Sequence, residues 1–275
     1  MGFGGYTKAK LKGAEETNMP YIKIDNLRTY YEVNGTGEVV VLLHNGFSCC
    51  KMWAQVAERF IQAGFRVLMY DRRGYGQSQG GPDFEDHYIS NGFREAAVGA
   101  MDALVAALGI DAFHIVGQCE GGVVGVDYAV RFPQKVKTLT TASTLCYSEI
   151  PLEDFNRLKF PKTFYDLPHD IQMKYVYWHG PERAKAFYEL CSRYGGCYGR
   201  DLFDLRPELQ RVGCPVLVMY PDRGHFFEAE QGVAFFRSLG KGELAIFPKC
   251  GHNIFEHYPD LYAETAIAFI ARNTA

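Results

Sequence analysis

Residues 115–124 read IVGQCEGGVV, and the interpretation of the whole chain depends on this stretch. An apolar run leads into a turn of glycines that contains one cysteine, and a second apolar segment follows with the spacing of a helix. Between a strand and a helix, the pattern Gly-x-nucleophile-x-Gly makes a tight, strained turn that lifts the middle side chain above the sheet. The glycines are needed because side chains there would collide with the neighbouring strand and helix. The stretch therefore predicts that Cys119 occupies a nucleophile elbow.

The elbow lies within a regular alternation of strand and helix patterns. Predicted helices cover 51–64, 93–109, 120–132 and 259–272, and predicted strands cover 21–25, 27–33, 38–46, 65–71, 111–117, 136–144, 214–221 and 242–248. Alternation of this kind is typical of α/β proteins. We therefore expect a mainly parallel eight-stranded sheet with helices on both faces.

Residues 147–208 interrupt the alternation. This segment has helical patterns, no strand pattern and many aromatic side chains. Because ligands bind at the carboxyl edge of open α/β sheets, we interpret 147–208 as a helical cap over that edge. The core would then comprise residues 1–146 and 209–275. The alternative is a helical layer remote from any site.

The composition excludes several classes of protein. The chain has 275 residues, 47% of them hydrophobic and 22% charged, with a net charge of −3, which favours neither nucleic acid nor an anionic membrane. Its first 18 residues contain no apolar stretch suited to a signal peptide or a membrane span. The eight cysteines form no Cys-x-x-Cys motif and no metal-ligand spacing, which predicts reduced thiols, a cytoplasmic location and no metal.

The ionisation of Cys119 follows from its predicted position. The positive end of a helix dipole lowers the pKa of a thiol at the helix N-terminus. We therefore expect a reactive thiolate at Cys119. The alternative is an inert buried cysteine on a glycine-rich turn.

Three further motifs carry a family resemblance: LLHNGF at 42–47, YDRRGYGQS at 70–78 and KCGHNIFEHYP at 249–259. With them, the chain resembles the α/β-hydrolase superfamily over nearly all of its length after residue 20. The Gly-x-Cys-x-Gly-Gly elbow is similar to that of dienelactone hydrolases. The YDRRGYGQS loop and the helical segment resemble instead the capped ester, epoxide and carbon–carbon bond hydrolases. The resemblance implies a hydrolase that needs no cofactor.

The resemblance assigns the triad histidine to His252. Family members usually have Gly-x-x-Asp after the preceding strand, but here Pro221 and Gly224 occupy the Gly and Asp positions. Asp222 is the nearest carboxylate, and the order Cys119, Asp222, His252 matches nucleophile, acid and base.

Other arrangements of the acid stay open. Glu228 and Glu149 are further candidates, and a Cys–His dyad without an acid is an alternative. A dyad is less costly for cysteine than for serine, because a thiolate–imidazolium pair has already transferred its proton.

The resemblance also implies an oxyanion hole of backbone N–H groups, from Glu120 and from Gly46 or Phe47. Three side chains are predicted to contact substrate: Asn45, Trp178 and His225. His44, Arg72 and Arg73 are interpreted as structural, with the two arginines bound to neighbouring carboxylates.

The leading hypothesis is a hydrolase in which Cys119 forms an acyl-enzyme with a small, partly apolar ester, lactone or thioester. Acyl transfer, carbon–carbon bond hydrolysis and a catalytically weak small-molecule receptor are the alternatives. Cys119 could also be an engineered replacement for serine, with the same residue roles. The expected partner is a small-molecule substrate, without nucleic acid or membrane, and a homodimer stays open.

Overall fold

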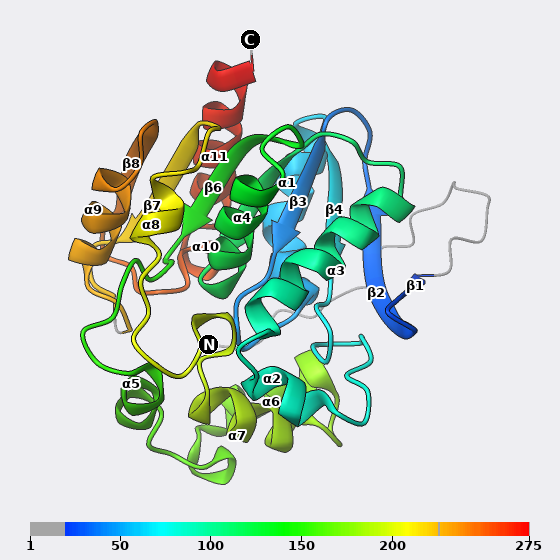
Figure 1. Cartoon of the computed structure of the whole chain (residues 1–275), viewed down its shortest axis with the longest axis vertical. Helices are drawn as coiled ribbons and strands as arrows, with labels where there is room; N and C mark the ends of the chain where they lie inside the picture. The colour runs from blue at the N-terminus through cyan, green and yellow to red at the C-terminus, as the bar shows by residue number, and fades with distance from the viewer. Residues whose placement is uncertain (1–19, 225, 275) are drawn as a thin grey trace.

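The computed structural model of the protein describes residues 20–224 and 226–274. Eight strands form one sheet in the order β1-β2-β4-β3-β5-β6-β7-β8 (Figure 1). The pairs β1–β2 and β2–β4 are antiparallel, and the other neighbouring pairs are parallel. The strands are β1 (Tyr21–Ile24), β2 (Leu27–Asn34), β3 (Val39–Leu43), β4 (Arg66–Tyr70), β5 (Phe113–Gln118), β6 (Val136–Ala142), β7 (Val216–Pro221) and β8 (Gly242–Phe247). The predicted mainly parallel, eight-stranded sheet is confirmed.

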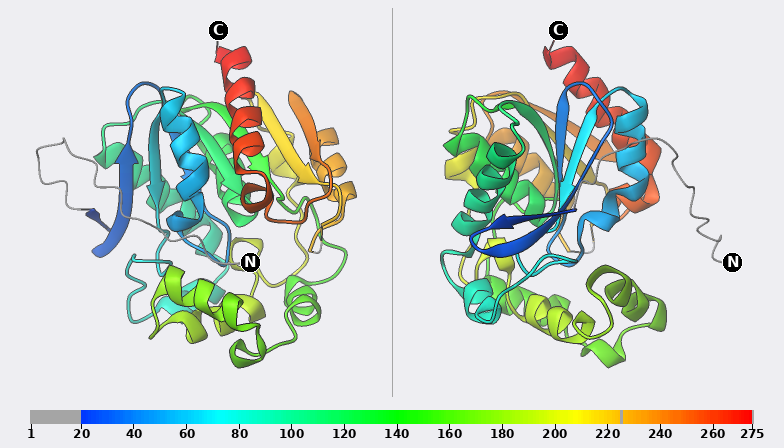
Figure 2. Two further views of the ribbon diagram at one scale, coloured as in Figure 1. Left: turned by 180° about the vertical axis from the view of Figure 1, so that it is seen from behind. Right: turned by 90° about the vertical axis from the view of Figure 1, so that its right-hand side faces the viewer.

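Helices cover both faces of the sheet, as predicted. In Figures 1 and 2, α1 (Ala54–Gln62) and α11 (Pro259–Thr274) lie on one face, and α3 (Phe93–Ala107), α4 (Glu120–Arg131) and α9 (Ala229–Arg237) lie on the other. The helix predicted at 51–64 is present as the short helix η1 (Cys50–Trp53) followed by α1. Three helices were not predicted: α9, α2 (Phe84–Ile89) and α10 (Ile254–His257). The central strands are apolar along their length because both faces are covered.

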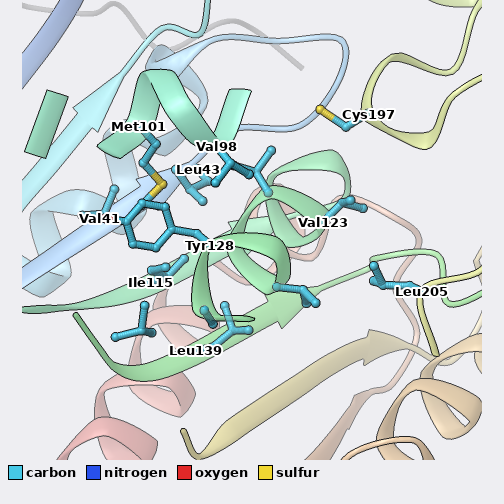
Figure 3. Close-up of a cluster of buried hydrophobic side chains, with 14 of the residues drawn as sticks. Val41, Leu43, Val98, Met101, Ile115, Val123, Tyr128, Leu139, Cys197 and Leu205 are labelled. Carbon is cyan, nitrogen blue, oxygen red and sulfur yellow. The ribbon is translucent and has the colours of Figure 1, made fainter. Parts of the chain in front are cut away.

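Two hydrophobic cores fill the space between the sheet and the two helical layers. Figure 3 shows part of the larger core, where Val41 and Ile115 of the sheet contact side chains of α3 and α4, among them Met101 and Tyr128. The hydroxyl of Tyr128 donates a hydrogen bond to Asp102 Oδ1 (2.8 Å), which satisfies the one polar atom of this large side chain. This core fixes α4 and the elbow that precedes it.

The segment that interrupts the alternation is helical. It contains α5 (Leu152–Lys159), η2 (Phe164–Asp166), α6 (His169–His179), α7 (Ala184–Arg193), η3 (Gly196–Tyr198) and, near its end, α8 (Arg206–Leu209). The right-hand view of Figure 2 shows α5, α6 and α7 as a layer beyond one end of the sheet. An antiparallel bridge between Tyr147 and Asp204 joins the two ends of the segment. Its boundaries as a separate cap stay a prediction.

Within the described part of the chain, no helix is both long enough and apolar enough to span a membrane.

Candidate active site

Cys119 lies between β5 and α4 with φ of 54° and ψ of −116°, a strained conformation for a residue with a side chain. Glycines let the chain make this turn. A Cβ on Gly117 would lie 2.4 Å from the carbonyl oxygen of Gly121, and a Cβ on Gly121 would lie 2.2 Å from that of Leu43. The turn is held by the N–H of Cys119, which donates to Ala142 O (2.8 Å). The local geometry is that of the predicted elbow.

The elbow opens into a cavity of about 250 Å³ between the sheet and helices α5 to α7. Cys119 and His252 both line this cavity. Its wall is largely aromatic, with Phe47, Phe160 and Trp178 among the lining residues. A concave, mostly apolar cavity with a few polar groups is the usual form of a small-molecule site.

The thiol of Cys119 is not the expected low-pKa thiolate. Its side chain is partly exposed to the cavity, but the surrounding protein excludes most water. This burial raises the pKa of the Cys119 thiol to about 12, although the hydroxyl of Tyr198 and the N–H of Glu120 act in the opposite direction. The prediction from the helix dipole was therefore wrong, because desolvation of the anion outweighs the favourable charge at the helix N-terminus.

His252 is held beside the elbow through its backbone. Its carbonyl oxygen accepts hydrogen bonds from Gln118 Nε2 (2.9 Å) and Ser143 Oγ (2.8 Å), at the ends of β5 and β6. Its ring packs against Phe226 and Phe227, with centroids 5.2 Å and 5.5 Å away. Burial lowers the pKa of the His252 imidazole to about 4, so the ring is neutral and can accept a proton.

Within residues 20–224 and 226–274, no hydrogen bond joins the His252 ring to Cys119 or to a carboxylate. Catalytic hydrogen bonds frequently form only when substrate is bound. The resting site therefore holds a neutral thiol and a neutral imidazole in one cavity, and not the preformed thiolate–imidazolium pair of the sequence analysis.

Asp222 follows β7, but its carboxylate points to other partners. Both of its oxygens accept hydrogen bonds from Arg223 (3.0 Å and 2.8 Å), and Oδ1 also accepts one from the N–H of Cys250 (3.4 Å). The adjacent guanidinium holds the pKa of the Asp222 carboxyl below its ordinary value. The predicted triad had Asp222 bonded to the His252 ring. In the structure the neighbouring guanidinium of Arg223 is hydrogen-bonded to both carboxylate oxygens instead. Glu149 and Glu228, the other candidate acids, are exposed and lie outside the cavity lining.

The position where the family has aspartate is sterically closed here. A Cβ on Gly224 would lie 1.8 Å from the carbonyl oxygen of Phe227, so the loop would have to move to accept a side chain.

The predicted oxyanion loop packs against the elbow. Asn45, Gly46 and Phe47 all line the cavity. The side-chain oxygen of Asn45, Oδ1, accepts hydrogen bonds from the N–H groups of Phe47 and Ser48 (both 2.9 Å). The N–H of Phe47 is therefore already engaged, and Gly46 stays the better candidate donor beside Glu120.

A histidine on α6 holds the same loop from the other side. The imidazole of His179 bridges the carbonyl oxygen of Phe47, 3.0 Å from Nε2, and the N–H of Gly76, which donates to Nδ1 (3.1 Å). The helical segment therefore contributes directly to the position of the predicted oxyanion loop.

The two loop arginines form the ion pairs expected of them. Arg72 pairs with Glu120 and Arg73 pairs with Asp83, each at 2.6 Å. His44 orients the loop, because its Nε2 accepts a hydrogen bond from the N–H of Arg72 (3.1 Å).

Trp178 and His225 were also predicted to contact substrate. Trp178 lines the cavity, and its ring packs edge-on against Tyr175 (5.8 Å between centroids). His225 lies outside the described residues.

Three side chains that contribute to the site were not predicted from the sequence: those of Gln118, Glu120 and Tyr198. Gln118 and Glu120 flank Cys119, but nothing in the pattern indicates where their side chains point. The hydroxyl of Tyr198 lies 3.4 Å from Cys119 Sγ. It comes from the helical segment, where one tyrosine among many aromatic residues carries no distinguishing signal.

Comparison with known proteins agrees with this architecture. A family model described as the alpha/beta hydrolase fold matches residues 38–171. The solved enol-lactonase from Burkholderia xenovorans LB400 superposes with a TM-score of 0.70 at 19% identity, covering 92% of this chain and 100% of that one. An esterase from Exiguobacterium antarcticum gives a TM-score of 0.73 at 18% identity, covering 91% and 98%. The chain has the α/β-hydrolase fold.

Curated relatives match over nearly the full length. A 2-hydroxy-6-oxo-6-phenylhexa-2,4-dienoate hydrolase from Burkholderia cepacia is 23% identical over 290 residues, which is 94% of this chain and 98% of the relative. A 2-hydroxy-6-oxononadienedioate/2-hydroxy-6-oxononatrienedioate hydrolase from Escherichia coli strain K12 is 23% identical, covering 90% and 92%.

Proposed function

We propose that this chain is a hydrolase that attacks a substrate carbonyl with the sulfur of Cys119, with His252 as general base and general acid. One observation carries the proposal: a strained elbow cysteine and a neutral histidine line the same apolar cavity. These groups supply a nucleophile and a base, so the reaction needs no cofactor.

In the first half-reaction, His252 takes the thiol proton as the sulfur of Cys119 bonds to the carbonyl carbon. The N–H groups of Glu120 and Gly46 stabilise the oxyanion of the tetrahedral intermediate. The intermediate collapses to an acyl-thioenzyme, and the leaving oxygen of an ester or lactone, or the leaving sulfur of a thioester, takes the proton from His252. In the second half-reaction water attacks the acyl carbon, His252 accepts a proton from it, and the thiol is regenerated as the acid departs.

Because the resting pair is neutral, the proton moves only as the sulfur attacks. The proposal includes a Cys119–His252 dyad, with Asp222 as a structural residue bound to Arg223. The aromatic wall and the cavity of about 250 Å³ suit a small ester, lactone or thioester with an apolar or aromatic substituent.

A second candidate is carbon–carbon bond hydrolysis, and the names of the full-length relatives favour it. A 6-oxo-6-phenyl-dienoate has no ester bond at its ketone, so hydrolysis there breaks the bond between C5 and C6. The dienol would first become its 2-oxo-3-ene tautomer, in which the 2-hydroxyl loses its proton and C5 gains one. Attack of Cys119 at C6 of this tautomer would release a carbanion at C5, which conjugation through C3=C4 to the C2 carbonyl stabilises. Lys174, a cation in the cavity lining that also contacts Glu256 (3.3 Å), would suit the substrate carboxylate.

A substrate panel tests the proposal and separates its two forms. Aryl esters, an enol lactone, an acyl thioester and 2-hydroxy-6-oxo-6-phenylhexa-2,4-dienoate are each incubated with the protein, and products and intact protein mass are measured. We expect turnover and an acyl adduct that disappears in Cys119→Ala and persists in Cys214→Ala, a cysteine outside the cavity. Binding without turnover or adduct across the panel would favour the receptor alternative, and turnover retained in Cys119→Ala would refute the nucleophile.

A further inference from the structure

Tyr198 brings a hydroxyl from the helical segment to the reacting sulfur. It lies in the short helix η3 and lines the same cavity as Cys119. Its Oη is 3.4 Å from Cys119 Sγ, within hydrogen-bond distance for sulfur. No other side-chain hydrogen bond to this sulfur is present among the described residues.

The hydrogen of this hydroxyl has a defined direction. The N–H of Leu145 donates to Tyr198 Oη (3.3 Å), so the oxygen already acts as an acceptor on that side. The O–H of tyrosine is then free to donate to Cys119 Sγ. Burial raises the pKa of the Tyr198 phenol well above its ordinary value, so the hydroxyl keeps its proton.

The position of Tyr198 is tied to the elbow itself. The N–H of the preceding residue, Cys197, donates to Glu120 Oε1 (3.2 Å), and Glu120 directly follows Cys119. The Tyr198 ring also packs edge-on against Phe203 and Phe227, with centroids 4.9 Å and 6.0 Å away. The hydroxyl is therefore held in place relative to the sulfur without a contribution from substrate.

We propose that Tyr198 is a catalytic residue that donates a hydrogen bond to the sulfur of Cys119. The bond stabilises negative charge on sulfur twice: when His252 removes the thiol proton, and when the thiolate departs from the acyl-thioenzyme. Tyr198 transfers no proton in either step. The inference rests on the proposed function in taking Cys119 as the nucleophile.

The test measures the thiol and needs no substrate. Wild type, Tyr198→Phe and Tyr220→Phe are treated with iodoacetamide at several pH values, and alkylation of Cys119 is followed by peptide mass mapping. Tyr220 is the matched control, because its buried hydroxyl donates to the carbonyl oxygen of Thr144 (3.2 Å) and not to sulfur. Below the thiol pKa, the alkylation rate is proportional to the thiolate fraction multiplied by the reactivity of the thiolate, which rises with the thiol pKa.

In Tyr198→Phe we expect a thiol pKa about one unit higher and alkylation of Cys119 about threefold slower at each pH, because the more basic thiolate is also more nucleophilic and offsets part of the tenfold lower thiolate fraction. Tyr220→Phe should react at the wild-type rate. An unchanged or faster rate in Tyr198→Phe, with a wild-type melting temperature, overturns the proposal.

A second variant covers the case in which Tyr198→Phe does not fold. Difluorotyrosine at position 198 has almost the same shape but a more acidic phenol, so it donates a stronger hydrogen bond. Alkylation of Cys119 should become faster, and an unchanged rate contradicts the proposal. If the proposal for Tyr198 is wrong, the acyl adduct on Cys119 still forms with the substrate panel. If the proposed function is wrong, that adduct is absent, so the two results are distinguishable.

Discussion

The carboxylate of Glu120, the residue that follows the elbow cysteine, forms a buried ion pair with the guanidinium of Arg72. Arg72 Nη1 lies 2.6 Å from Glu120 Oε2, and the two side chains are 4% and 3% exposed. Glu120 also accepts hydrogen bonds from the hydroxyl of Tyr75 and the N–H of Cys197, both at 3.2 Å. One carboxylate therefore joins the elbow, the loop after β4 and the turn that carries Tyr198.

Glu120→Gln is expected to destabilise the fold strongly. Removing one charge leaves Arg72 buried without compensation, which typically costs about 3–5 kcal/mol of unfolding free energy. Chemical denaturation measures the change. Asp83→Asn is the control, because it breaks an exposed ion pair with Arg73 and should cost at most about 1 kcal/mol. Equal, small effects in both variants would contradict this account of Glu120.

Gly121→Ala is expected to disrupt the elbow. The added Cβ would lie 2.2 Å from the carbonyl oxygen of Leu43, so backbone must shift, at a cost of about 1–3 kcal/mol or more. Gly99→Ala is the matched control on α3, where no atom lies within 4 Å of the added Cβ. There alanine should stabilise the helix by about 1 kcal/mol. Thermal unfolding of both variants tests whether the close approach exists.

Asp222→Asn is expected to keep nearly the wild-type rate of hydrolysis, because the carboxylate is bonded to Arg223 and to the N–H of Cys250 and not to the His252 ring. The measurement is kcat/KM with the best ester of the panel. A loss of several hundred-fold, with an unchanged melting temperature, would restore Asp222 as the triad acid.

Cys119→Ser is expected to be nearly inactive. Hydroxyl oxygen is a much weaker acid than a thiol, and loss of the acid in a serine triad costs about 10⁴ in rate. Without a carboxylate on His252, serine would incur that penalty in full, whereas the penalty for cysteine should be much smaller because its thiol is the stronger acid. Single-turnover acylation rates of the two proteins provide the test, and comparable rates would show that an acid assists His252.

The acid limb of the pH–rate profile is expected near pH 4. His252 accepts a proton only when neutral, and burial lowers the pKa of its imidazole from 6.5 to about 4. Activity should therefore persist as the pH falls below 6.5 and decline only as it passes through about 4. The profile of kcat/KM against pH measures this limb. A half-maximal rate near the ordinary histidine pKa would mean that water reaches the ring.

The sequence by itself determined the fold, the strand–helix turn at Cys119 and the position of His252 after the last strand. Continuous apolar runs specify the buried parallel strands. The glycines around Cys119 indicate that the backbone of the turn lies close to neighbouring backbone, where any side chain would collide. These signals are local, so a short stretch of residues carries each of them.

Only the tertiary structure decided the ionisation and the partners of the site. The pKa of Cys119 depends on how completely neighbouring segments exclude water, and this burial outweighs the helix dipole that the sequence reveals. Asp222 follows strand β7 as predicted, but its carboxylate is hydrogen-bonded to the adjacent Arg223. Tyr198 is 79 residues from Cys119, and folding alone brings its hydroxyl to the sulfur. Side-chain direction and desolvation arise from contacts between distant segments, which no local pattern records.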